Sequence, residues 1–76
     1  MTQFRSLDLR GTACPVNFIR CKLTLETLQM GELLDVMLDR GEPEAMVLPG
    51  LRREGHNVVI VEDHPTWILL RVTRGG

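Results

Sequence analysis

The sequence lacks any strong excess of charge of one sign. It contains 9 Lys and Arg against 10 Asp and Glu, for a formal net charge of -1. This balance gives no electrostatic reason to expect binding to nucleic acid or to an anionic membrane surface. No apolar run approaches the roughly 18 to 20 residues of a membrane span. Residues 1–5 lack the apolar stretch of a signal peptide, so we expect a cytoplasmic protein that contacts no membrane.

Cysteine and histidine are scarce, with two of each. If Cys14 and Cys21 lie on one helix, a rise of about 1.5 Å per residue separates them by about 10 Å. A disulfide needs Cα atoms within about 7 Å, so we expect both thiols to be free. His56 and His64 are isolated, and no Cys-x-x-Cys spacing occurs. We therefore expect no metal site and no cofactor.

Internal repeats, linkers and low-complexity segments are also missing. A chain of 76 residues is small, and one of this size buries only about 60% of its unfolded surface, so every regular element must share one core. The composition, 43% apolar and 25% charged, is that of an ordinary globular protein. We expect a single domain over residues 1–76.

The chain alternates between strand-like and helix-like segments. Strands are predicted over residues 4–9, 33–38, 58–61 and 67–72, the last two forming a hairpin. A first helix is predicted over 15–30, between Pro15 and Gly31. A second starts near Pro43 and should kink or split at Pro49. One core in so short a chain requires both helices on one face of the sheet. The prediction is an α+β two-layer sandwich, in β-α-β-α-β-β order, with a four-stranded mixed sheet.

The first predicted helix carries two apolar stripes. The stripe expected to face the core comprises Phe18, Cys21, Leu25 and Leu28. A second, shorter stripe comprises Val16, Ile19 and Leu23. This second stripe either widens the buried surface or forms a docking patch for a partner beside Cys14.

Cys14 is the candidate reactive residue. It directly precedes Pro15, which opens the first helix, so it lies at or next to the N-cap. The unpaired backbone N–H groups and the helix dipole at that point favour thiolate over thiol. The alternative is a small apolar residue at a strand–helix junction. Arg10 and Gly11, just upstream, favour the functional interpretation.

The segment from Leu7 to Pro15, Leu-Asp-Leu-Arg-Gly-Thr-Ala-Cys-Pro, resembles the signature of the TusA/SirA family of small sulfur-carrier proteins. That signature runs Asp-x-x-Gly-x-x-Cys-Pro-x-Pro. The resemblance covers nearly the whole chain, since Gly31-Glu32, Leu48-Pro49-Gly50 and Gly55-His56 also follow the family pattern.

The resemblance implies a function for Cys14. In the family, this cysteine accepts sulfane sulfur as a persulfide, from a cysteine desulfurase or another donor protein, and passes it to a downstream acceptor protein. Such a protein is a sulfurtransferase-type carrier, which needs no cofactor and meets nucleic acid only through a partner. Arg10, Gly11, Pro15 and Asn17 are the residues expected to support Cys14. Arg10 either adds positive charge near the thiol or is a solvated arginine at the end of a strand.

The sequence departs from the family pattern at two places. Asn17 stands where the family has its second proline, which adds a backbone donor and a side-chain amide near Cys14. This change alters the surface that a partner would recognise. The family's acidic residue in the second helix is also missing, because Val47 and Leu48 precede Pro49.

Two other functions are compatible with the sequence. The chain ends in Gly75-Gly76, as do ubiquitin-like carriers that form a C-terminal thiocarboxylate. Those proteins begin with a β-hairpin, however, whereas a helix follows the first strand here. The second alternative is a binding or regulatory module in which Cys14-Pro15 only shapes a docking surface. Alkylation of Cys14 separates them, because a diglycine carrier would keep its function.

Overall fold

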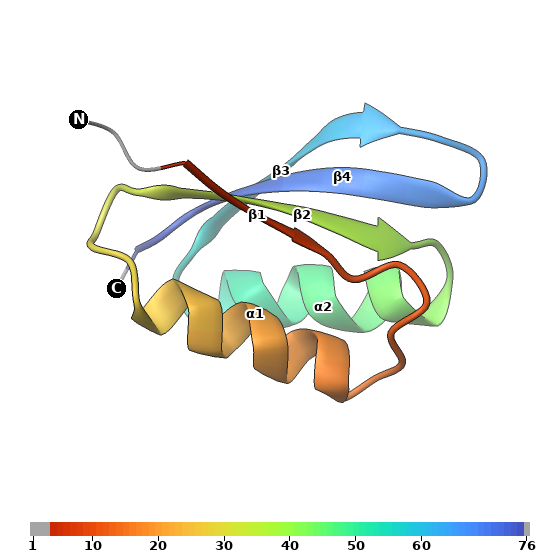
Figure 1. Cartoon of the computed structure of the whole chain (residues 1–76), viewed down its shortest axis with the longest axis horizontal. Helices are drawn as coiled ribbons and strands as arrows, with labels where there is room; N and C mark the ends of the chain where they lie inside the picture. The colour runs from red at the N-terminus through yellow and green to blue at the C-terminus, as the bar shows by residue number, and fades with distance from the viewer. Residues whose placement is uncertain (1–3, 76) are drawn as a thin grey trace.

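The computed structural model describes residues 4–75 and consists of four strands and two helices. The elements are β1 (Phe4–Asp8), α1 (Val16–Glu26), β2 (Leu33–Asp39), α2 (Glu42–Arg53), β3 (Asn57–Asp63) and β4 (Trp67–Thr73). Both helices lie on the same face of one sheet (Figure 1). The predicted α+β two-layer sandwich and its element order are confirmed.

The sheet is mixed, with the strand order β1-β2-β4-β3. The α1 crossover makes β1 parallel to β2, and Leu7 pairs with Val36. β4 is antiparallel to both of its neighbours, with Leu70 opposite Val36 on one side and Ile60 on the other. The predicted hairpin is confirmed: its turn is closed by His64 N–H, which donates to the Trp67 carbonyl at 3.0 Å.

The core lies between the sheet and the helices. Alternate residues of β4 are buried because strand side chains point to opposite faces, and one face of this sheet is covered. From α1, Cys21 and Leu25 enter this core together with Leu28, as predicted, while Phe18 is only partly buried. The second stripe of α1 is exposed. Its interpretation as additional buried surface is wrong.

The predicted first helix is too long at its C-terminal end. α1 stops at Glu26 rather than Met30. The side-chain hydroxyl of Thr27 donates to the Thr24 carbonyl at 2.6 Å, which competes with continuation of the helix. The guanidinium of Arg74 donates to the carbonyl of Leu28. The first bond satisfies a carbonyl of the last helical turn and the second a carbonyl just after it, while Leu28 still reaches the core.

The second helix was predicted to kink or split at Pro49, and the split is wrong, because α2 continues through that residue. Proline removes one backbone donor, which leaves the carbonyl of residue 45 without its helical partner. Ala45 and Pro49 are both exposed, so that carbonyl lies at a surface that water can reach. Packing against α1 also supports the helix: a Cβ added to Gly50 would lie 2.7 Å from Cε1 of Phe18.

Burial of Cys21 makes a prediction about alkaline pH. The core raises the pKa of this thiol from 9.0 to about 12. Between these values the unfolded chain loses a proton that the folded chain keeps. The contribution of the Cys21 thiol to the free energy of unfolding is therefore fully present below pH 9.0. It falls as pH rises above that value, by up to about 1.4 kcal/mol per pH unit. Urea melts of wild type and Cys21→Ala at increasing pH should show a shallower decline in the variant. Parallel declines would contradict the prediction.

Candidate functional site

Cys14 lies in a shallow hollow between the start of α1 and one face of α2. The hollow has a volume of about 190 Å³. Its lining consists of Cys14, Pro15, Phe18, Met46, Gly50 and Arg53. Apart from Arg53 these neighbours are apolar or small, and Cys14 itself is half-buried. The thiol is thus accessible from solvent but surrounded mainly by carbon.

The loop that carries Cys14 is fixed at both ends. Gly11 adopts a φ of +80°, a conformation that favours glycine, and its N–H donates to Oδ2 of Asp39 at 2.7 Å. This bond ties the loop to the end of β2. Pro15 is the N-cap of α1, and the Cys14–Pro15 peptide bond is cis. Cys14 therefore stands one residue before the cap, close to its predicted place.

Asn17 is fully buried and connects the loop to the first turn of α1. Its Nδ2 donates to the Thr12 carbonyl at 3.4 Å, and its Oδ1 accepts from Phe18 N–H at 2.6 Å. Its own N–H donates to the Ala13 carbonyl at 3.2 Å. The backbone and side-chain donors that Asn17 was expected to add near Cys14 are therefore bound to carbonyls of the preceding loop. The expectation that Asn17 alters the surface recognised by a partner is wrong, because its side chain is buried.

Replacing Asn17 with alanine should destabilise the protein. The change removes both side-chain hydrogen bonds at a buried position, at a cost of about 1 to 3 kcal/mol. Thermal melts measure this loss. Asn57→Ala is the matched control, because Asn57 is exposed at the start of β3. An Asn17→Ala variant as stable as this control would show that the loop does not depend on Asn17.

Arg10 does not line the hollow. Its guanidinium forms two hydrogen bonds of 2.9 Å with the carboxylate of Asp8. It also lies over the Trp67 ring, 4.7 Å from the ring centre. Mainly through the side-chain hydrogen bond, Arg10 lowers the pKa of Asp8 to about 2. Arg10 is thus engaged at the end of the sheet rather than in the hollow of Cys14.

The residues that α2 contributes to the hollow were not predicted from the sequence. Met46, Gly50 and Arg53 follow the spacing i, i+4, i+7, which places them on one face of a continuous helix. The expected split at Pro49 obscured this pattern. Like Arg10, Arg53 is exposed. Unlike Arg10, it forms no hydrogen bond or ion pair with any residue in the described range 4–75.

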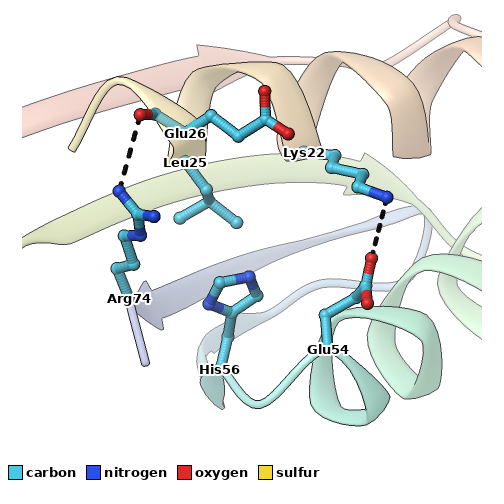
Figure 2. Close-up of a pocket in the computed structure, with 6 residues that line it drawn as sticks. All are labelled: Lys22, Leu25, Glu26, Glu54, His56 and Arg74. Carbon is cyan, nitrogen blue, oxygen red and sulfur yellow. Dashed lines mark hydrogen bonds and ion pairs between the residues drawn. The ribbon is translucent and has the colours of Figure 1, made fainter. Parts of the chain in front are cut away.

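A second hollow, of about 180 Å³, lies between the later turns of α1 and the C-terminal part of the chain. Figure 2 shows Lys22 paired with Glu54, at 3.0 Å, on one side and Arg74 bound to the Glu26 carbonyl on the other. Both cations are therefore engaged. Their bonds connect α1 to α2 and to the segment after β4. The charged residues of this hollow therefore hold elements of the fold together.

The C-terminal segment is held at the same place. Gly75 N–H donates to Nδ1 of His56 at 3.2 Å. A Cβ on Gly75 would lie within 4 Å of the Gly55 carbonyl oxygen and would clash with it. Gly76 lies outside the described residues. Gly75 is thus packed against the entry to β3.

The residues that the structure describes form neither a metal site nor a membrane-spanning helix. Within residues 4–75, no three Asp, Glu, His or Cys side chains gather closely enough to hold a metal ion. Neither of the two helices has the length and apolar character required to cross a membrane.

Comparisons with known proteins agree on one family. The sequence model of the family described as "Sulfurtransferase TusA" matches residues 5–74. A protein of Archaeoglobus fulgidus named "Putative sulfur carrier protein" is 46% identical over 57 residues, which cover 74% of this chain and 64% of that protein. A Thermotoga maritima protein of the same name is 30% identical over 59 residues, covering 78% of this chain and 75% of that protein. The chain thus spans less than two thirds of the Archaeoglobus relative.

A solved structure shows the same fold. The crystal structure of a SirA-like protein from Desulfitobacterium hafniense superposes with a TM-score of 0.79. The match covers 95% of this chain and 99% of that one, at 22% sequence identity. At this identity the likeness concerns the arrangement of strands and helices alone.

Proposed function

Because this chain belongs to the sulfurtransferase TusA family, we propose that it is a sulfur carrier. Cys14 accepts sulfane sulfur as a persulfide from a donor protein, such as a cysteine desulfurase, and relays it to an acceptor protein. The observation that carries this proposal is the position of Cys14, half-buried in an open hollow before α1, while the other cysteine is sealed in the core. Only one thiol is accessible to a second macromolecule.

The chemistry requires no cofactor. The thiolate of Cys14 attacks the terminal sulfur of a donor hydropersulfide, R–S–SH, so that a new S–S bond forms and the donor's S–S bond breaks. The bonding electrons leave with the donor as R–S⁻, and the transferred sulfur keeps its proton. One S–S bond replaces another, so there is no net oxidation. An acceptor thiolate then repeats the step on Cys14–S–SH.

The exposed stripe of α1 supplies the docking surface in this proposal. Val16, Ile19 and Leu23 expose 52%, 47% and 57% of their surface, and Met46 exposes 56% at the hollow itself. Val16 directly follows Pro15, and Met46 lines the hollow together with Cys14, so one end of this surface lies beside the thiol. We assign this surface to the donor protein, whose persulfide must reach Cys14.

Two features favour this function over its alternatives. Gly75 is packed against His56 and Gly55, which contrasts with the extended tail that diglycine chemistry uses. A binding module without transfer chemistry would not need an accessible thiol. The proposal therefore depends on Cys14 rather than on the C-terminal segment.

Intact mass spectrometry tests the proposal. The protein is incubated with a cysteine desulfurase and cysteine, and the product is then digested to locate any added mass. We expect a gain of one sulfur atom at Cys14, which dithiothreitol removes and prior alkylation prevents. No gain, or a gain confined to Cys21, would contradict the sulfur-carrier proposal and favour a binding module.

A further inference from the structure

The groups that the sequence suggests as sources of positive charge for Cys14 are bound elsewhere in the structure. Arg10 is bound to Asp8 and lies over Trp67, at the end of the sheet. The N–H groups of Asn17 and Phe18, in the first turn of α1, donate to oxygens of the protein. The expected sources of positive charge are therefore largely committed to other partners.

Arg53 is the remaining cation at this place. Apart from Cys14 itself, it is the only ionisable residue that lines the hollow. It is exposed, and within residues 4–75 no carboxylate or carbonyl binds its guanidinium. A hollow of about 190 Å³ is small enough for one arginine side chain to reach across it. Its neighbours on α2 do not compete, because Arg52 donates to the Val58 carbonyl and Glu54 pairs with Lys22.

A sulfur bound to Cys14 needs such a partner. A persulfide ionises more readily than a thiol, so its terminal sulfur is an anion near neutral pH. The hollow offers that anion the Phe18 ring, Met46 and Pro15, none of which donates a hydrogen bond. An anion in mainly apolar surroundings is unfavourable unless a cation lies nearby.

We propose that Arg53 binds the terminal sulfur anion of the Cys14 persulfide and holds it in the hollow, an inference that rests on the proposed sulfur-carrier function. Phe18 and Met46 then enclose the transferred atom, since sulfur packs favourably against aromatic rings and thioethers. Arg53 neutralises the negative charge on that sulfur, which reduces the repulsion met by the acceptor thiolate that attacks it.

The test uses inorganic polysulfide, so that no partner protein is required. The Cys14 thiolate takes one sulfur from a polysulfide dianion, forming Cys14–S–S⁻ and a polysulfide one atom shorter, and charge and electrons balance. The variants are Arg53→Gln and the conservative Arg53→Lys. Arg20→Gln is the matched control, because Arg20 is an exposed arginine of α1 outside the lining.

Two measurements distinguish a role at the sulfur from a structural one. In Arg53→Gln we expect loading to slow by about fivefold, the effect of one partly exposed charge pair. The pH profile for alkylation of the loaded persulfide should shift to higher pH. Arg53→Lys should restore both, Arg20→Gln should resemble wild type, and melting temperatures should not change. Added salt should reduce the difference between Arg53→Gln and wild type.

The outcomes separate this inference from the proposed function. If wild type loads sulfur and Arg53→Gln shows the same rate and pH profile, the assignment of Arg53 is wrong and the carrier function stands. If Arg20→Gln is affected as strongly as Arg53→Gln, the effect is that of general charge, which also overturns the assignment. If wild type itself acquires no sulfur at Cys14 from polysulfide or a desulfurase, the carrier function fails.

Discussion

Replacing Cys14 with serine should abolish sulfur loading while leaving the protein folded. The oxygen of serine cannot form a persulfide, so the mass gain expected for wild type should disappear entirely. Stability should change little, because the side chain is half-buried beside Pro15 and serine is favoured near helix starts. Intact mass and a thermal melt on the same sample measure both effects. Loading that survives in Cys14→Ser would show that another group carries the sulfur.

Cys21→Ser is the control for this experiment. It places a hydroxyl in the core, where Cys21 is fully buried, and should destabilise the protein by about 1 to 3 kcal/mol. In a domain of this size such a loss lowers the melting temperature by several degrees. Sulfur loading should persist, because Cys14 is intact. A folded Cys21→Ser protein that cannot load sulfur would replace the single-cysteine mechanism with a two-thiol relay.

Placing a charge on the exposed stripe of α1 should have the second large effect. Ile19→Asp puts a carboxylate where the proposed donor protein docks, and desolvating it should slow loading from a cysteine desulfurase by about tenfold or more. Loading from inorganic polysulfide should keep its wild-type rate, because no docking is involved. Time courses of intact mass with each donor provide the comparison.

Met30→Asp is the matched substitution for this test. Met30 is more exposed than Ile19, at 72% against 47%, and lies in the loop after α1 rather than on the stripe. It should load normally from both donors. Equal effects of the two substitutions on desulfurase-dependent loading would remove the case for a docking surface on α1. Slower loading of Ile19→Asp from polysulfide as well would indicate damage to the site itself.

The sequence predicted the fold well because its signals are local. Pro15 marks the start of α1, and the β-branched runs of the last two strands flank an evident turn. The course of the chain just after α1 also involves Arg74, which is distant in sequence and binds the Leu28 carbonyl. No local pattern contains that information. Pro49 is similar, because its tolerance inside α2 depends on the exposure of Ala45 and on packing at Gly50.

Only the part of the site formed by the segment around Cys14-Pro15 was predicted from the sequence. Cys14, Pro15 and Asn17 are neighbours in sequence, and the structure places all three at the start of α1. Arg53 reaches the hollow only through the packing of α2 beside α1, a tertiary relationship. Arg10 was considered as a source of positive charge for Cys14 because it is near in sequence. Its bidentate bond with Asp8, two residues earlier, was the stronger local interaction.

The contact of Trp67 with Arg10 gives the protein an intrinsic fluorescent probe. Trp67 is the single tryptophan, and tyrosine is absent, so indole fluorescence has one origin. The ring stacks on His64 at 4.1 Å and lies beneath the guanidinium of Arg10, which belongs to the same loop as Cys14. A partner that moves this loop would change the environment of the indole. Binding that displaces this loop should therefore change the emission of Trp67, without any added label.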